Sequence, residues 1–487
     1  MINSERPSPR VTAGLACLLT AGALAACGSV GGATDGGEGG GGDGSRSADG
    51  SGSDDGGSDG TRDASTSAEA AANDAGAKDA SVADVVAHDA WSTDSAAADA
   101  SAGDGSSAGD SSAPDSSALA EAGADGSTTG FGAATAVAAG QSFCALTASG
   151  GVVCWGNNPQ GQLGNNTTTT SLVPVQVTGL TSAVTSMSLG LFSACALSGG
   201  GLQCWGGNSY GELGNGSMTS SPVPVPVSGL TSGVASVSVG TGSACAVTAG
   251  GGVQCWGDNG FGGLGNGSTI ESAVPVHVTG LTTGVSSVSV GGMTACAVTT
   301  GGGVQCWGNG YSGQLGNNVE GQSTVPVQVS GLTSGVASVS VGDRTVCALT
   351  NAGSVLCWGS NQYGTVGNNA TTDALVPTAV TGLPSGTTSV SVGADVACAL
   401  TTGGAVMCWG YGVFGELGNG TTTTSLVPVQ VTGLTSGVTS MSAGHFGACA
   451  AIACGVQCWG NGPLGDDTTP ASDVPVSVDR LGASPCP

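Results

Sequence analysis

The chain has 487 residues, of which 92 are glycine and only 8% are charged, and its formal net charge at pH 7 is −26. Seven Lys and Arg residues against 33 Asp and Glu residues argue against nucleic-acid binding through phosphate contacts. Composition divides the chain into residues 1–26, 27–130, 131–480 and 481–487.

Residues 1–26 have the pattern of a signal peptide. Arg6 and Arg10 precede an apolar run that is too short to span a membrane. The segment ends in "LAAC", which resembles the bacterial lipobox, so Cys27 is the expected lipidation site; the alternative is an ordinary signal peptide with a chance cysteine. We therefore expect an exported protein of the bacterial cell envelope that meets the membrane only through its lipid anchor. In some bacteria, an Asp directly after the lipidated cysteine is linked to retention in the inner membrane. Gly28 occupies this position here, so the outer membrane or cell surface is favoured.

Residues 27–130 form an acidic segment rich in Gly, Ser, Ala and Asp, with almost no large apolar side chains. Such a segment cannot bury enough surface to offset its ordering entropy, so we predict a disordered linker. Calcium binding by "DGSGSDDGGSDG" is the alternative, but the EF-hand spacing and its closing Glu are missing. A flexible tether of about a hundred residues spans roughly 50–60 Å.

Residues 131–480 contain one unit repeated seven times. The stretch "CALTASGGVVCWG" begins at Cys144, and six related copies follow it. Each copy ends in "WG", and the tryptophans of the seven copies recur every 50 or 51 residues. They are Trp155, Trp205, Trp256, Trp307, Trp358, Trp409 and Trp459.

Each repeat predicts four short strands. "SVSVG" alternates in the manner of a half-buried strand, and a Gly-rich turn joins "CALT" to "VVCWG" as a hairpin. The fourth segment, "VPVQV", contains a proline and therefore belongs at a sheet edge. Four antiparallel strands in about 50 residues are typical of one propeller blade. The predicted fold is all-β: a seven-bladed β-propeller with four antiparallel strands per blade, preceded by the disordered linker.

The motifs "CALTASGGVVCWGNNPQGQLG" and their six relatives resemble the regulator of chromosome condensation repeat family, also called alpha-tubulin-suppressor-like. The resemblance covers residues 131–480, about 70% of the chain, and implies a seven-bladed propeller. The export signal and acidic balance argue against nucleotide exchange on a small GTPase and chromatin binding, the founding member's activities. The family also includes secreted bacterial propellers, similar to a β-lactamase inhibitory protein, that bind another protein. A His common in the family is replaced here by Ser142, Ser193, Ser243, Thr294 and Thr345.

Most of the eighteen cysteines fall in the predicted hairpins, at a spacing of nine or ten residues. Opposite positions of a hairpin lie about 4.5–5.5 Å apart, within disulfide reach, and export provides an oxidising compartment. Metal binding and free thiols are the alternatives. The predicted pairs are Cys144 with Cys154, Cys195 with Cys204, Cys245 with Cys255, Cys296 with Cys306, Cys347 with Cys357, Cys398 with Cys408, Cys449 with Cys458, and Cys454 with Cys486.

The repeats show no pattern of a catalytic, cofactor-binding or metal site. A nucleophile needs a neighbouring base, and the repeats contain only His277 and His445, in different copies. The Gly-rich turns are not followed by the Lys of a phosphate loop. Aromatic residues precede a turn glycine in several copies, and their shared register predicts that they pack as scaffold: Tyr210, Phe261, Tyr363 and Phe414.

The loop after "SVSVG" differs among the copies, and its residues should encircle one rim of the ring. Exposed aromatic residues and Arg are common anchors of protein interfaces, so this rim is the candidate binding surface. The alternative is variation in loops that tolerate it. The predicted partner-binding residues are Phe192, Met293, Asp343, Arg344, Asp395, His445 and Phe446.

The function expected from these features is that of a monomeric cell-envelope lipoprotein whose non-catalytic propeller binds a protein or a surface polymer. A secreted inhibitor of one enzyme is an alternative. An envelope hydrolase or lyase that uses the propeller channel is another.

Overall fold

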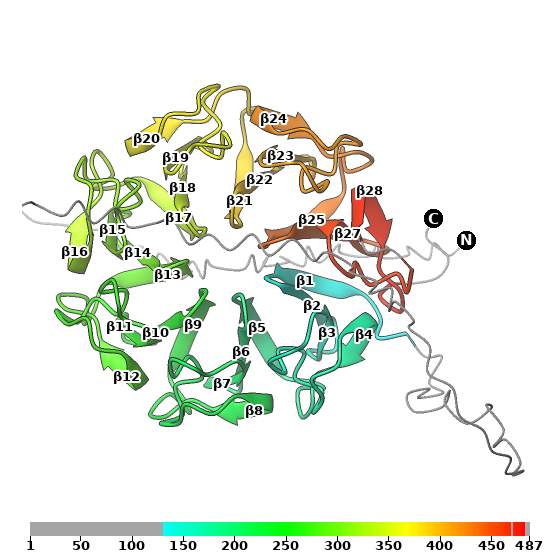
Figure 1. Cartoon of the computed structure of the whole chain (residues 1–487), viewed down its shortest axis with the longest axis horizontal. Coiled ribbons are helices and arrows are strands. Elements are labelled where there is room, and N and C mark those ends of the chain that lie inside the picture. Colours follow the sequence, from blue (N-terminus) through cyan, green and yellow to red (C-terminus); the bar gives the residue numbers. More distant parts are fainter. Residues whose placement is uncertain (1–129, 469–470, 483–487) are drawn as a thin grey trace, which may run out of the picture. The chain divides into compact units, whose positions relative to one another are not determined.

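The computed structural model describes residues 130–468 and 471–482. In this part, 28 strands form seven four-stranded antiparallel sheets arranged in a ring (Figure 1). The four strands of each sheet are consecutive in sequence, so every blade is one contiguous stretch of chain. The predicted seven-bladed propeller is confirmed. The predicted signal peptide and nearly all of the predicted linker lie outside the described residues.

The strands occupy equivalent places in every blade, from the ring axis outward. The innermost strands are β1 (Ala134–Ala139), β5 (Val184–Leu189), β9 (Val234–Val239), β13 (Val285–Gly291), β17 (Val336–Val341), β21 (Thr387–Val392) and β25 (Val438–Ala443). The second strands are β2 (Ser142–Thr147), β6 (Ser193–Ser198), β10 (Ser243–Thr248), β14 (Thr294–Thr299), β18 (Thr345–Thr350), β22 (Val396–Thr401) and β26 (Gly447–Ile452). The third strands are β3 (Val152–Gly156), β7 (Gly201–Gly206), β11 (Val253–Gly257), β15 (Val304–Gly308), β19 (Val355–Gly359), β23 (Val406–Gly410) and β27 (Gly455–Asn461). The outer strands are β4 (Ser171–Gln176), β8 (Ser221–Pro226), β12 (Ser272–His277), β16 (Ser323–Gln328), β20 (Ala374–Ala379), β24 (Ser425–Gln430) and β28 (Ala471–Ser477).

The hydrophobic core lies between the blades rather than inside any one of them. Both β2 and β3 are buried along their whole length, because a neighbouring blade covers each face of their sheet. Seven clusters of buried apolar side chains result, one at each interface between adjacent blades. The outer strand keeps one free edge, where Pro174 of β4 needs no hydrogen-bond partner, as predicted.

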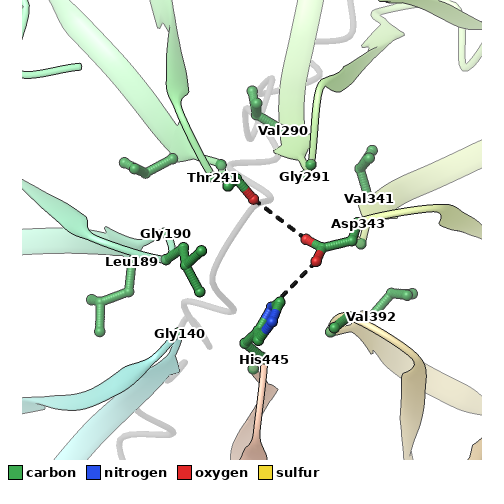
Figure 2. A pocket seen from close by; sticks show the side chains of 18 of the residues that line it. Gly140, Leu189, Gly190, Thr241, Val290, Gly291, Val341, Asp343, Val392 and His445 are labelled. Atoms are coloured by element: carbon green, nitrogen blue, oxygen red, sulfur yellow. Dashed lines mark hydrogen bonds and ion pairs between the residues drawn. The ribbon is translucent and has the colours of Figure 1, made fainter. Parts of the chain in front are cut away.

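The glycines that follow the innermost strands form a ring around the axis (Figure 2). A Cβ added to Gly190 would collide with the carbonyl oxygen of Gly240, and one added to Gly393 would collide with that of Gly444. The glycine of "SVSVG" is therefore required for space, because neighbouring backbones approach too closely for a side chain. The seven glycines are Gly140, Gly190, Gly240, Gly291, Gly342, Gly393 and Gly444.

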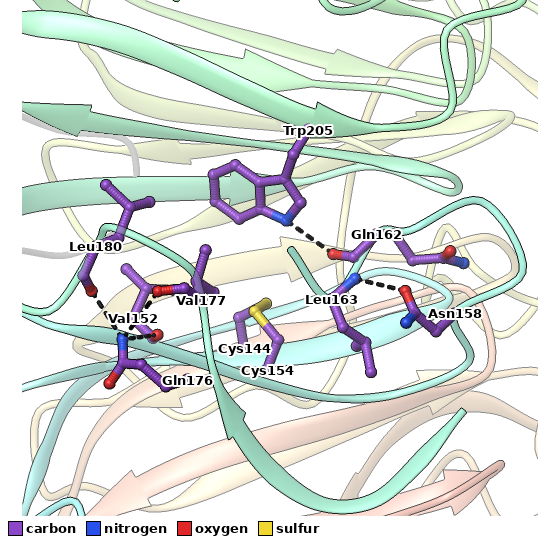
Figure 3. Close-up of a disulfide and its surroundings, with 10 residues drawn as sticks. All are labelled: Cys144, Val152, Cys154, Asn158, Gln162, Leu163, Gln176, Val177, Leu180 and Trp205. Carbon is purple, nitrogen blue, oxygen red and sulfur yellow. Dashed lines mark hydrogen bonds between the residues drawn. A yellow bond between two sulfur atoms is a disulfide. The ribbon is translucent and has the colours of Figure 1, made fainter. Parts of the chain in front are cut away.

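The seven predicted hairpin disulfides are present. Each joins residues directly opposite each other on the second and third strands, as Cys144 and Cys154 do (Figure 3), and the paired Cα atoms are 4.0–4.1 Å apart. Each bridge closes a short loop, so its entropic stabilisation is at most about 2–3 kcal/mol. Cys454 is also disulfide-bonded. Its predicted partner Cys486 lies outside the described residues.

Each repeat tryptophan packs against a turn glycine of the preceding blade. A Cβ on Gly164 would lie only 2.8 Å from Nε1 of Trp205, and this Nε1 donates a hydrogen bond of 2.9 Å to the carbonyl of Gln162 (Figure 3). The tryptophan thus buries its ring and satisfies its one donor in the same contact. The same bond is made by Trp256, Trp307, Trp358, Trp409 and Trp459.

The ring closes between the last blade and the first without any exchange of strands. Trp155 packs on Gly465, but its buried Nε1 has no hydrogen-bond partner among the described residues. The turn of the last blade is three residues shorter between tryptophan and leucine, and Pro463 precedes its leucine. A backbone hydrogen bond of 2.8 Å from Phe131 to Arg480 adds to this closure.

The second serine of "SVSVG" joins neighbouring blades. The hydroxyl of Ser188 accepts a hydrogen bond of 3.0 Å from the amide of Val239. The first blade carries Ala138 at this position and has no hydroxyl to offer. The equivalent acceptors are Ser238, Ser289, Ser340, Ser391 and Ser442.

Replacing Trp205 with Phe should destabilise the protein more than replacing Trp155 with Phe. Both changes remove aromatic bulk, but only the first breaks a buried hydrogen bond, and we expect a difference of about 1 kcal/mol in the free energy of unfolding. Urea unfolding of the two variants measures this difference. Equal destabilisation would contradict the role assigned to the indole hydrogen bond.

Candidate functional site

The two faces of the ring are built from different kinds of loop. On one face lie the turns between first and second strands and the long loops between third and fourth strands; in the first blade these are residues 140–141 and 157–170. We call it the long-loop face. The opposite short-turn face carries residues 148–151 and 177–183 of the first blade and their equivalents.

Charged side chains gather on the long-loop face. The loops of the short-turn face contain only Asp479 and Arg480 among their described residues, and are otherwise rich in Gly, Ser and Thr. The long-loop face has Arg344 as its one basic residue besides His445, within the described part of the chain. Its acidic residues are Glu212, Asp258, Glu271, Glu320, Asp343, Asp373, Asp395, Glu416, Asp466 and Asp467.

Three side chains meet at the axis on this face, directly beyond the glycine ring (Figure 2). His445 Nδ1 lies 3.2 Å from Asp343 Oδ2, and Thr241 Oγ1 donates a hydrogen bond of 3.5 Å to Asp343 Oδ1. The three residues follow β25, β17 and β9 respectively, so alternate blades are bridged across the axis. The structure thus brings two of the predicted rim residues, Asp343 and His445, into contact.

The Asp343–His445 pair shifts the titration of both groups. Burial raises the pKa of Asp343, but the hydrogen bond and positive charge of His445 outweigh it, and the pKa of Asp343 lies below its usual value. Burial lowers the pKa of His445, but the hydrogen bond and charge of Asp343 raise it above its usual value. The charge of Asp395 raises the pKa of His445 further. The pair is therefore stabilised in its charged form.

A central channel of about 780 Å³ lies along the innermost strands. Ser and Thr side chains line it together with Ala, Val, Leu, Ile and Met, and none of its described lining residues is charged. Among the described residues no group of three or more His, Cys, Asp or Glu side chains could hold a metal ion. No helix in the same part of the chain is long and apolar enough to cross a membrane.

Four other predicted rim residues each lie two positions after the axial glycine of their blade, and a backbone hydrogen bond holds each of them in place. The carbonyl of Phe192 accepts a hydrogen bond of 2.8 Å from Gly207, and that of Arg344 accepts one of 2.9 Å from Ser360. Met293 and Asp395 hold equivalent places in their blades, and Met293 is 38% exposed. These side chains lie on one face but on different blades, so they form a rim and not a cluster.

Phe446 follows His445 and packs edge-on against its imidazole, with ring centroids 4.6 Å apart. Its carbonyl accepts a hydrogen bond of 2.7 Å from Asn461, the same backbone contact as in the other blades. The phenyl ring thereby supports the imidazole beside the Asp343 carboxylate.

Aromatic side chains in the long loops are more exposed than their shared register predicts. Tyr210 and Phe414 are each 49% exposed, so the prediction that these residues pack as scaffold is wrong for both. The buried part of each turn is the glycine that follows, and the preceding side chain is left at the surface. We call the group the aromatic arc; it consists of Tyr210, Phe261, Tyr311, Tyr363, Tyr411 and Phe414.

Buried carboxylates support two members of the aromatic arc. Glu416 accepts a hydrogen bond of 2.9 Å from the amide of Phe414, and Glu212 accepts one of 2.9 Å from the amide of Tyr210. Burial raises the pKa of Glu416 to about 7, against the lowering effect of its backbone hydrogen bonds. Burial also raises the pKa of Glu212. These carboxylates hold the loop backbone, as Gln162 and Gln314 do elsewhere.

A family model described as the RCC1-like domain matches residues 101–480. The chain belongs to the RCC1-like domain family. Human E3 ubiquitin-protein ligase HERC2 is 32% identical over 242 residues, which are 47% of this chain and 5% of that protein. Ultraviolet-B receptor UVR8 of Arabidopsis thaliana is 30% identical over 197 residues, 40% of this chain and 45% of that receptor. The chain spans less than half the length of these two relatives.

Solved structures show the same RCC1-like propeller. Prp20p of Saccharomyces cerevisiae superposes with a TM-score of 0.60 at 19% identity, covering 69% of this chain and 87% of that one. Human WBSCR16 superposes with a TM-score of 0.57 at 24% identity, covering 64% and 84% respectively. At these identities the likeness concerns the fold alone.

The Asp343–His445 pair should make the stability of the RCC1-like propeller depend on pH. Because the pKa of His445 is raised, its contribution is complete below the unfolded value of about 6.5 and is lost as pH rises through the folded value. Because the pKa of Asp343 is lowered, its contribution is present above about 3.9 and is lost as pH falls through the folded value.

The stability difference between the unmodified protein and His445→Gln should therefore be largest between about pH 4 and 6.5, and about 1 kcal/mol or less for a pair of this exposure. Urea unfolding across pH measures it. NMR titration should show the pKa of His445 falling in Asp343→Asn. A pH-independent difference would contradict the ion pair.

Proposed function

We propose that this RCC1-like propeller binds a protein partner through its long-loop face, and that a lipid on Cys27 holds the chain to the bacterial cell envelope. One observation carries the binding proposal. The residues that differ among the seven blades, including nearly all charged and exposed aromatic ones, gather on that face, while the short-turn face repeats Gly, Ser and Thr. Exposed aromatic and Arg side chains are typical anchors of protein interfaces.

Within the described residues, the chain enters and leaves the ring at the short-turn face, opposite the face assigned to the partner. The amide of Phe131 is bonded to the carbonyl of Arg480, at the short-turn face where β1 begins. Export and lipidation are supported by Arg6, Arg10 and the "LAAC" sequence that ends at Cys27.

Relatives with the same fold provide examples of protein binding. One structure of yeast Prp20p is described together with its binding properties to Gsp1p and histones, and another contains the yeast protein bound to Kap60. These partners belong to Prp20p. They support a binding role for the present propeller without indicating its partner, which on this proposal is a protein of the envelope or an enzyme that the propeller inhibits.

An envelope hydrolase or lyase is the second candidate. Asp343 and His445 lie together at the narrow end of the channel, where a carboxylate and an imidazole could exchange protons with a ligand. Their mutual ion pair has to open for this chemistry. Release of products from a panel of envelope glycans, abolished in Asp343→Asn, would favour this candidate over binding.

Partner capture from an envelope extract tests the binding proposal. We expect the double variant Phe192→Ala, Phe446→Ala to lose at least tenfold in capture of the partner, since large interface anchors cost about 1.4 kcal/mol or more when truncated. The control variant Thr282→Ala changes an exposed side chain of the short-turn face and should capture as the unmodified protein does. Equal capture by both variants would contradict binding at this face.

Lipidation of Cys27 is tested separately. The unmodified protein should incorporate labelled fatty acid and sediment with membranes, because acyl chains provide stable anchoring. The variant Cys27→Ala should lose both properties while the propeller keeps its disulfides. If the unmodified protein incorporates no labelled fatty acid and stays in the soluble fraction, residues 1–26 act as an ordinary signal peptide instead.

A further inference from the structure

We infer that the long-loop face recognises a basic polypeptide segment, whose Lys and Arg side chains lie on the aromatic arc and pair with the acidic residues beside it. This inference rests on the proposed function and adds the chemistry of the partner. It depends on three features of the described residues: exposed rings, carboxylates placed next to them, and the scarcity of cations on the same face.

Five of the six rings of the aromatic arc form two groups of contacts, each of which spans two neighbouring blades. Tyr363 and Tyr411 belong to adjacent blades, and their ring centroids are 4.9 Å apart; Tyr411 and Phe414 are 6.1 Å apart. Phe261 and Tyr311, also in adjacent blades, are 6.3 Å apart. Tyr311 is 59% exposed and Phe414 is 49% exposed, while Phe261, Tyr363 and Tyr411 are half-buried. Together they offer aromatic faces to a ligand that crosses several blades.

Carboxylates border these rings. A Cβ on Gly242 would lie 3.4 Å from the Cβ of Asp258 and 3.7 Å from Cδ2 of Tyr210, so the acid and the ring flank the same spot. The carbonyl of Asp395 accepts a hydrogen bond of 2.9 Å from the amide of Tyr411. Burial raises the pKa of Tyr411, and the negative charges of Glu416 and Asp395 raise it further. A cation that stacks on either ring is therefore within reach of a carboxylate.

This combination selects among kinds of partner. Of the ten acidic residues on this face, Asp343 is paired with His445, and burial raises the pKa of Glu212 and Glu416. The other seven still outnumber Arg344, so the face has a negative field that attracts cations and repels anionic polymers. A purely apolar partner would desolvate the carboxylates without pairing them, which is costly. A neutral glycan would use the rings and leave the charges unpaired. Arg and Lys use both, because a guanidinium or ammonium group stacks on an aromatic face and pairs with a carboxylate.

Fluorescence anisotropy with labelled octa-arginine on the full chain tests the inference, with octa-glutamate and a neutral chitin hexamer as comparison ligands. We expect only octa-arginine to bind, with an affinity that falls as salt rises. Tyr210→Ala and Asp258→Asn should each weaken binding about three- to tenfold. Arg344→Ala should strengthen it, since it removes the cation of the face.

Matched controls separate this face from the rest of the acidic chain. Tyr210→Phe keeps the ring and should bind as the unmodified protein does. Asp479→Asn removes one carboxylate from the short-turn face and should also bind normally. Equal affinity of Asp258→Asn and Asp479→Asn would assign octa-arginine binding to general acidity, for example of residues 27–130, and would overturn the inference.

The remaining outcomes distinguish this inference from the proposed function. If a captured envelope protein dissociates when octa-arginine is added, both stand. A partner that is captured but not displaced leaves protein binding intact and overturns the basic chemistry. Binding of the chitin hexamer in place of octa-arginine overturns it in favour of a glycan. Failure to capture a protein and to bind octa-arginine rejects both.

Discussion

The packing of a tryptophan on the turn glycine of the preceding blade is the contact on which the propeller depends. Trp205 on Gly164 sets the distance and tilt between two blades, and equivalent pairs set all the others. No blade has a core of its own, since each cluster of buried side chains belongs to two blades. Each blade therefore depends on its neighbours for burial of its apolar side chains, and closing the ring leaves neither face of any blade uncovered.

The contacts that maintain the ring are repeated, and the side chains that give it chemical character are not. Glycines at the axis, serines between blades and disulfides within hairpins use the same positions in blade after blade. The side chains that follow Gly342 and Gly444 are not repeated among the blades, and here Asp343 and His445 form their ion pair. The repeated contacts of the blades thus fix the positions of the variable residues in the turns of the long-loop face.

Seven internal copies made the fold, the strand order and the hairpin disulfides predictable, because a pattern that recurs at one spacing identifies positions with one structural role. The same reasoning failed for Tyr210 and Phe414, since a shared register also arises where only the neighbouring glycine is buried. The Asp343–His445 contact joins blades five and seven across the axis. It depends on the radius of the ring, which strand patterns do not specify. The partnerless indole of Trp155 likewise results from tertiary closure.

The contiguous blades have a consequence for chain connectivity. Phe131 and Arg480 are hydrogen-bonded neighbours, although one enters the first blade and the other leaves the last. Because no strand is exchanged at this seam, the chain could be joined here and cut in any loop that connects two blades, and every sheet would be preserved. The seam is thus one of seven nearly equivalent places at which a circularly permuted ring could begin. The addition or loss of a blade by recombination would leave each remaining sheet whole, but it would change the curvature of the ring and with it the contacts across the axis.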